Sequence, residues 1–172
     1  MNRMEIYMIY KNMKIFLDGM GLVLYSNEAM HYVKEGEDFL TNEFLLPEQA
    51  AKHIKKGDIV GFNIGTGGEF EIKIREGYPN YEISKQYPIS IRLAINVKGN
   101  IISIVDFLWL LEWCNDVPEE QQIQVEEGIY HLTILTTKPY SGIWGDNQVI
   151  YIFMNRLKQM PELSWNGIPQ LL

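Results

Sequence analysis

The chain has 172 residues, 47% of them hydrophobic, and this size predicts one domain with a continuous core over residues 1–172. The single cysteine, Cys114, excludes an internal disulfide, and the first residues lack the apolar run and cleavage site of a secretory signal, so we expect a cytoplasmic protein. No apolar stretch approaches the ~18 residues that cross a bilayer, which excludes a membrane-spanning helix.

The net charge of -7 is concentrated in one segment of the chain. Residues 106–127 contain seven acidic residues and no Lys, Arg or His, whereas the rest of the chain holds 15 acidic and 15 basic residues. Nucleic-acid affinity depends on clustered Lys and Arg, so this distribution argues against a nucleic-acid partner. It favours a basic protein as the partner.

Patterns typical of β-strands recur along the chain. They include β-branched and aromatic runs at MEIYMIY, KIFLD, DIVGFNI, IYHLTILTT and VIYIFM. In EFEIKIRE, Phe70, Ile72 and Ile74 alternate with charged residues, which predicts a half-buried strand. ISIRLAINV also alternates, and the turn KGN after it predicts a hairpin with IISIV. About eight or nine strands follow, so the fold class is predicted to be mainly β, an antiparallel β-sandwich or open barrel.

One or two short helices are expected. PEQAAKHIKK, residues 47–56, is predicted to be a helix because Pro47 stands in its first turn, basic residues stand in its last turn and Gly57 follows as a stop. DFLWLLEWC, residues 106–114, is apolar on nearly every side, so periodicity does not decide between a helix capped by Asp106 and a buried strand. The final residues, about 156–172, are expected to pack onto the body as an irregular tail.

The glycines of GFNIGTGG, residues 61–68, do not form a nucleotide-binding loop. The residue that would complete G-x-G-x-x-G after Gly65 is Phe70, and the following segment alternates as a strand where a phosphate motif needs a helix. We interpret this segment as a hairpin turn.

No catalytic or metal-binding pattern stands out among the nucleophiles and histidines. His31, His53 and His131 lack the spacing that places two ligands on one metal, so we predict neither a metal site nor a cofactor. Cys114 lies among acidic residues, which disfavour a reactive thiolate, and we interpret it as a small core residue. No serine lies in a G-x-S-x-G motif.

Two groups of residues are candidates for a protein-binding site. The acidic segment supplies charge at Glu119, Glu120, Glu126 and Glu127. The loop KPYSGIWGDNQ, between two predicted strands, supplies Tyr140, Trp144 and Asp146. Loop aromatics beside an acid are common anchors of protein interfaces.

The order of features in residues 89–154 resembles the small bacterial inhibitor family of competence protein J, which neutralises a partner nuclease, and more broadly the immunity proteins that protect bacteria from toxins. The resemblance lies in IRLAINVKGNIISI, the acidic stretch, VEEGIYHLTILTT and the loop before VIYIFM. The chain departs from the pattern in DFLWLLEWC and in the tail after Met154. The resemblance implies a non-enzymatic protein that occludes the active site of a toxin.

We therefore predict a non-enzymatic protein-binding domain, an inhibitor or immunity protein for a basic partner such as a nuclease toxin. The alternative is a small-ligand-binding protein or hydrolase with a cavity between the sheets. Trp109, Trp113 and Tyr130 would line that cavity, with His131 or Glu112 at its mouth. A third possibility is a homo-oligomer subunit with an apolar patch around the final IPQLL.

Overall fold

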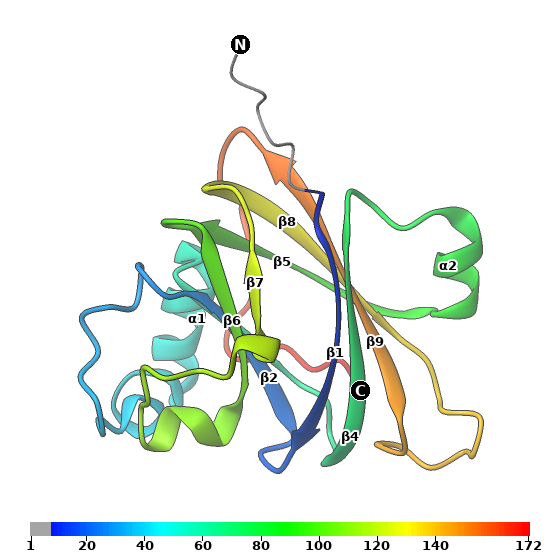
Figure 1. Cartoon of the computed structure of the whole chain (residues 1–172), viewed down its shortest axis with the longest axis horizontal. Helices are drawn as coiled ribbons and strands as arrows, with labels where there is room; N and C mark the ends of the chain where they lie inside the picture. The colour runs from blue at the N-terminus through cyan, green and yellow to red at the C-terminus, as the bar shows by residue number, and fades with distance from the viewer. Residues whose placement is uncertain (1–7) are drawn as a thin grey trace.

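The computed structural model describes residues 8–172, which form two β-sheets with helical segments on their outer sides (Figure 1). The larger sheet contains, in spatial order, β1 (Tyr10–Leu17), β4 (Gly68–Glu76), β9 (Gln148–Leu157), β8 (Gly128–Thr136) and β5 (Ile89–Val97). The smaller sheet contains β3 (Ile59–Asn63), β2 (Gly21–Ser26), β6 (Ile101–Asp106) and β7 (Gln122–Gln124). The predicted mainly β fold is confirmed.

One pair of strands departs from the antiparallel pattern. β4 and β9 pair in parallel, with Ile72 opposite Ile150, so this one pair differs from the antiparallel arrangement that was predicted. β5 also runs in the direction of β4, because β8 is antiparallel to both β9 and β5. Strands that run in the same direction need a crossover connection. Residues 77–88, which include α2 (Tyr81–Gln86), form this crossover, and the ring of Tyr87 lies 5.0 Å from that of Tyr151 on β9.

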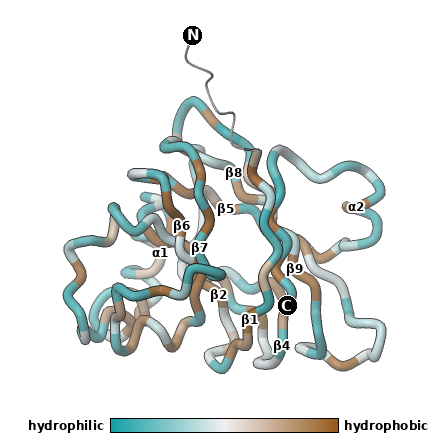
Figure 2. Tube along the Cα trace, in the orientation of Figure 1, coloured by the Kyte–Doolittle hydropathy of each residue, from teal (hydrophilic) through white to brown (hydrophobic). Residues whose placement is uncertain are grey.

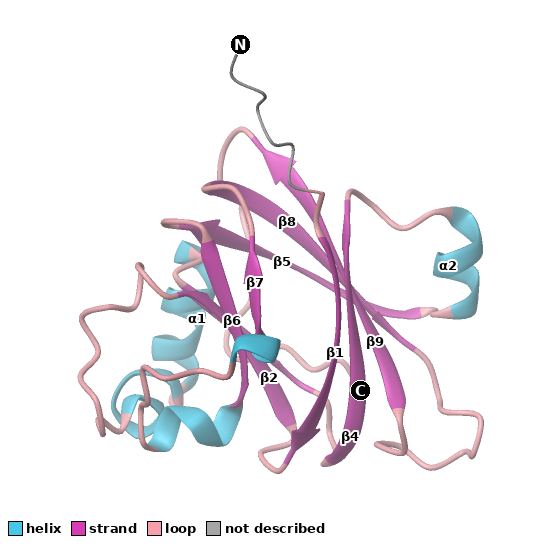
Figure 3. Cartoon of the chain, viewed as in Figure 1, coloured by secondary structure: helices cyan, strands magenta, loops and turns pink. Residues whose placement is uncertain are grey.

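The helical segments lie on opposite sides of the two sheets (Figure 3). α1 (Pro47–Lys56) has the predicted bounds and ends at Gly57, whose positive φ of 77° is the left-handed conformation of a helix stop. The undecided segment 106–114 forms a 3-10 helix, Phe107–Leu111, and the Asp106 carboxylate accepts a hydrogen bond from the amide of Leu108. A π-helical turn, Leu40–Phe44, precedes α1. α2 lies apart from these elements, beyond the larger sheet.

The two sheets differ in how much of their surface is buried. In β4, Phe70, Ile72 and Ile74 point into the core as predicted, and the charged residues between them remain partly exposed. In β2, by contrast, all six residues are buried. Strands that are covered on both faces consist of continuous apolar runs without alternation. For this reason GLVLYS, which forms β2, was not predicted to be a strand. The short β7 was not predicted either.

Two predicted hairpins are wrong because the chain changes sheets at these turns. β5 pairs with β8 and β6 pairs with β2 and β7, so the turn KGN carries the chain from the larger sheet to the smaller one. The glycine segment similarly leads from β3 to β4. Its role is close backbone packing, since a Cβ on Gly68 would lie 2.2 Å from the carbonyl oxygen of Gly145.

The two ends of the chain also refine the predictions. KIFLD belongs to a strand that begins at Tyr10, and most of MEIYMIY lies outside the described residues. β9 extends to Leu157, so the irregular tail begins slightly later than expected. The tail packs on the body as predicted, with Leu171 buried and Gln170 bridged to Asn63.

Two further expectations concern Cys114 and membrane-spanning segments. Cys114 is half-buried, so the prediction that it is a core residue is wrong. No helix formed by residues 8–172 is long and apolar enough to cross a membrane.

Candidate functional site

The structure separates the four glutamates predicted to supply charge. Glu119 and Glu120 form an exposed 3-10 turn before β7. Glu126 and Glu127 follow β7, at its other end. Glu126 forms an ion pair of 2.9 Å with Arg156.

Glu127 is engaged in the fold itself. Its carboxylate accepts a 2.8 Å hydrogen bond from the amide of Gly99, in the turn between β5 and β6. Its backbone carbonyl accepts a second bond of 2.8 Å from the guanidinium of Arg156. The contacts of Glu126 and Glu127 therefore join β9 and the β5–β6 turn to the start of β8.

The predicted aromatic loop lies elsewhere. Tyr140 is fully exposed, Trp144 is half-buried and Asp146 is exposed, all in the loop between β8 and β9. The nine residues of β8 separate this loop from Glu127, which corresponds to a distance of about 30 Å. Figure 1 shows the loop at the end of the larger sheet opposite to the start of β8. The predicted site residues therefore do not form one site.

The residues of the alternative cavity are not brought together either. Trp113 lies in the helical layer, where its ring centre is 4.9 Å from that of Tyr25, and Tyr130 lies in the larger sheet. The two residues line different pockets. His131 is hydrogen-bonded at Nδ1 to the hydroxyl of Tyr78, 3.0 Å away, as expected for a structural histidine.

A second acidic segment, which the sequence reasoning missed, pairs with residues 113–115. The amide of Gly36 donates to the carbonyl of Trp113 at 2.7 Å, and the amide of Trp113 donates to the carbonyl of Glu37 at 2.9 Å. The amide of Asn115 donates to the carboxylate of Glu35 at 2.8 Å. These bonds bring acids from two distant parts of the chain together.

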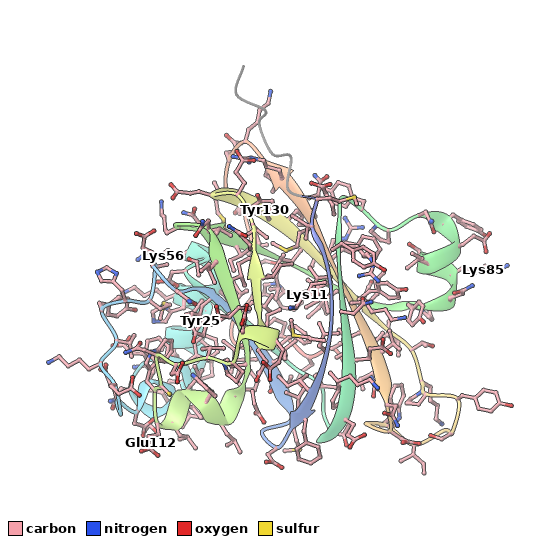
Figure 4. The ribbon with its side chains drawn as sticks, in the orientation of Figure 1. Lys11, Tyr25, Lys56, Lys85, Glu112 and Tyr130 are labelled. Carbon is pink, nitrogen blue, oxygen red and sulfur yellow. The ribbon has the colours of Figure 1, made fainter. Side chains whose placement is uncertain are left out.

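We call the carboxylates of these two segments and the following turn the acidic surface. Its members are Glu35, Glu37, Asp38, Glu112, Asp116, Glu119 and Glu120, all exposed or half-buried. Lys34 is the only Lys or Arg in residues 27–51, and residues 106–127 contain none. Figure 4 shows Glu112 at the outer edge of the helical layer, pointing away from the body. The signal available in the sequence was the acid-rich run EGEDFLTNE. It did not stand out because basic residues elsewhere in the chain balance its negative charge when the net charge outside residues 106–127 is counted.

Buried aromatic residues pack beneath the backbone segments that carry the acidic surface. Trp113, Phe39 and Phe44 are each at most 2% exposed, and the ring centre of Phe39 lies 5.6 Å from that of Trp113 and 6.3 Å from that of Phe44. Figure 2 shows hydrophobic stretches on β6 and in the segments around α1. This packing fixes the backbone that carries the acids.

A histidine between two carboxylates ties α1 to its neighbours. Nδ1 of His53 lies 3.1 Å from the carboxylate of Asp58, and Nε2 lies 3.4 Å from that of Glu43. Burial lowers the pKa of His53, but its hydrogen bonds and charge interactions with Asp58 and Glu43 outweigh burial and leave the pKa above its ordinary value. Burial raises the pKa of Asp58, but His53, the amide of Ile59 and Lys56 together leave it below its ordinary value.

The electrostatic environment of the nearby Tyr32 is negative. Burial, followed by the charges of Asp58, Glu43 and Glu37, raises the pKa of Tyr32 to about 12. Burial and the nearby carboxylates both disfavour the phenolate, so they raise the pKa of Tyr32 in the same direction. Within residues 8–172, no three His, Cys, Asp or Glu side chains are arranged to hold a metal ion.

No protein-family model matches the sequence, and no curated protein matches it either. One solved structure that is similar is that of ComJ from Bacillus subtilis, an inhibitor of the DNA-degrading activity of NucA. The TM-score is 0.53 at 13% sequence identity, over 87% of this chain and 97% of ComJ. A second is a protein described as Crocagin biosynthetic gene J, with a TM-score of 0.53 at 9% identity, over 84% of this chain and 97% of that one.

The predicted resemblance to the competence protein J type is therefore confirmed at the level of the fold. At identities of 13% and 9%, the likeness concerns the arrangement of the backbone and not individual residues. Since one fold can carry unrelated functions, the surface chemistry of this chain must carry any functional argument.

Proposed function

We propose that this protein is a non-enzymatic inhibitor or immunity protein, which binds a basic partner protein, such as a nuclease, through its acidic surface. The observation that carries the proposal is the joining of two acidic segments, residues 35–38 and 112–120, by hydrogen bonds that backbone amides donate to backbone carbonyls and to the Glu35 carboxylate. Acids gathered on a fixed backbone create a negative potential, which steers a basic partner into contact and increases its rate of association.

The fold supports this proposal independently of the charge. ComJ, which has the same fold over most of both chains, is an inhibitor of the DNA-degrading activity of NucA. Nucleases that act on a polyanion present basic surfaces around their active sites. An acidic protein surface can occupy such a surface in place of nucleic acid and thereby block the enzyme.

The test is capture of a partner from native cells at low and at high salt, followed by a DNA-degradation assay of the captured protein. We expect a basic protein that binds at low salt, is released at high salt, and loses its DNA-degrading activity when this protein is added. The proposal is wrong if no protein partner is captured at low salt. It is also wrong if adding this protein does not inhibit a DNA-degrading activity of the captured protein.

A matched pair of variants locates the binding surface. The site variant carries Glu112→Lys, Asp116→Lys and Glu119→Lys, all at exposed positions of the acidic surface. The control variant carries Glu69→Lys, Glu82→Lys and Glu162→Lys, also at exposed positions but on β4, on α2 and in the tail. Both variants change the net charge equally. We expect the site variant alone to lose the partner, and equal loss in both would contradict a localised surface.

A further inference from the structure

An apolar pocket of about 410 Å³ opens beside the acidic surface. Its walls come from the turn after β1, the π-helical turn with the start of α1, the end of β3, the 3-10 helix after β6, and the tail. The lining residues are Gly19, Leu40, Leu45, Pro47, Asn63, Phe107, Leu108 and Ile168. A pocket of this volume can hold a large apolar side chain.

The walls of the pocket are fixed by hydrogen bonds. The carboxylate of Asp106 accepts bonds from the amides of Gly19 at 2.9 Å and Leu108 at 3.1 Å, which joins two of the walls. The tail is joined to β3, since Asn63 donates to the carbonyl of Pro169 and accepts from the amide of Leu171, both at 2.8 Å. Because these contacts are made within the chain itself, the walls of the pocket are held in place by the fold.

Exposed leucines surround the pocket. Leu45 and Leu108 line it and are 57% and 45% exposed, and their neighbours Leu46 and Leu111 are 56% and 43% exposed. Single exposed leucines need no explanation, but several grouped around a pocket are typical of an interaction surface.

The segments that build the pocket carry acids and no cation. Residues 17–21, 35–51, 106–112 and 163–172 contain no Lys, Arg or His. The exposed Asp18 is the chain neighbour of the lining residue Gly19, and the exposed Glu112 follows Leu108 by four residues. Glu48, next to Pro47, lines a neighbouring hollow together with Lys52 and Lys55. The charge around the pocket therefore favours a cationic ligand and disfavours an acidic one, including a second copy of this chain with its net charge of -7.

We infer that the pocket receives one large apolar side chain carried on a Lys- or Arg-rich segment of the partner protein. The inference rests on the proposed function and specifies the chemistry of the partner. The apolar side chain acts as the buried anchor of the interface, and the flanking cations contact the exposed acids. Leu45 and Leu108 are the residues of this chain that distinguish an apolar anchor from a small side chain.

The test uses two fluorescein-labelled peptides, KKSKWKSKK and KKSKAKSKK, which have the same charge and differ only in the apolar residue. Fluorescence anisotropy measures the affinity of each peptide for the full chain at low salt. We expect the peptide with tryptophan to bind roughly tenfold more tightly, because a buried anchor is worth this much or more in an interface.

Matched variants assign this preference to the pocket. Leu45→Ser and Leu108→Ser alter lining residues, whereas Leu46→Ser and Leu111→Ser alter neighbours of similar exposure that do not line it. We expect the first two variants to bring the two peptides to nearly equal affinity and the second two to keep the tenfold preference. A preference that survives in Leu45→Ser and Leu108→Ser, or disappears equally in all four variants, overturns the inference.

The acidic surface variant separates this inference from the proposed function. Glu112→Lys with Asp116→Lys should weaken both peptides and leave the ratio of their affinities unchanged. If both peptides bind the wild type equally and release with salt, the pocket inference is wrong and the acidic surface still binds basic ligands. If neither peptide binds, the pocket inference is wrong, and the proposed function is decided by the capture of a protein partner.

Discussion

The outer faces of the two sheets are covered in very different ways. On the smaller sheet, residues 27–57 and 107–117 form a helical layer with its own aromatic core, in which Trp113 and Phe39 are almost completely buried. On the larger sheet, the crossover of residues 77–88 is the corresponding cover, and none of the residues of α2 is buried. The first cover is part of the hydrophobic core, whereas the second rests on the sheet through contacts such as those of Tyr78 and Tyr87.

This difference explains where a binding surface can be built. The acidic surface and the apolar pocket both belong to the helical layer, whose buried aromatics hold their backbone in place. A rigid support lowers the entropic cost of binding, because the contacting groups are already positioned. The crossover offers no comparable support, since a short helix without buried residues can open locally at little cost.

The largest expected effect tests the core of the helical layer. Trp113→Ala removes a side chain that is 2% exposed and contacts the rings of Tyr25 and Phe39. We expect a loss of about 3 to 5 kcal/mol in the free energy of unfolding, measured by urea denaturation. Tyr87→Ala, in the crossover, is the comparison and should cost much less because Tyr87 is only half-buried. Equal losses in the free energy of unfolding would show that the helical layer and the crossover contribute equally to the stability of the fold.

A second, smaller effect tests the contact between the helical layer and its sheet. A Cβ on Gly21 would lie 1.8 Å from the ring of Phe107, so Gly21→Ala forces that ring to move. We expect a loss of about 2 kcal/mol in urea denaturation, as is usual for overpacking. The cost should shrink when Gly21→Ala is made together with Phe107→Leu, because the shorter side chain leaves room. An unchanged cost in that background would mean that the ring is not the obstacle.

The same difference between the two covers decided which strands could be recognised in the sequence. β4 alternates because its outer face is partly exposed, and Phe70, Ile72 and Ile74 were assigned correctly from that pattern. β2 is buried on both faces and shows no alternation. The pairing of β5 and β6 was predicted wrongly because a short turn with glycine is equally compatible with a hairpin and with a change of sheet, and only long-range packing decides between them.

The candidate site could be predicted only in part. The acidic character of residues 112–120 was evident from local composition, but its partner segment around Glu35 is more than 70 residues away in the chain. The two are joined by backbone hydrogen bonds, which leave no side-chain pattern in a sequence. Glu126 has an ion pair with Arg156, a contact that a count of charges does not reveal. The pocket was not predicted for the same reason, since its walls come from five separate segments of the chain.

A third prediction tests whether the crossover opens on its own. The side chain of Asn80 accepts a 2.9 Å hydrogen bond from the amide of Ile83 at the start of α2. Asn80→Ala should destabilise this helix by about 1 kcal/mol, the usual cost of losing an N-cap. We expect hydrogen exchange of the α2 amides to become roughly fivefold faster while the global free energy of unfolding barely changes. Lys85→Gln, at an exposed position of α2, is the control and should leave both quantities unchanged.

The smallest expected effect is a pH dependence in the helical layer. His53 has a raised pKa in the folded state, so its protonation stabilises the fold below the ordinary value of 6.5, and this contribution is lost as the pH rises through the raised pKa. Burial lowers the pKa of His53 and the two carboxylates raise it, so these causes act in opposite directions. Urea denaturation from about pH 6 to about pH 9 should show the wild type losing stability relative to His53→Gln.

His131 is present in both proteins, so its titration cancels in this comparison. Asp58 titrates on the acid side of the range, because its pKa lies below the ordinary value. The difference in the free energy of unfolding between the wild type and His53→Gln therefore measures how much the interactions of His53 with Asp58 and Glu43 hold α1 in place. Two curves that stay parallel over this range would mean that the charge on His53 does not help to hold the helical layer, which would then depend on its aromatic packing alone.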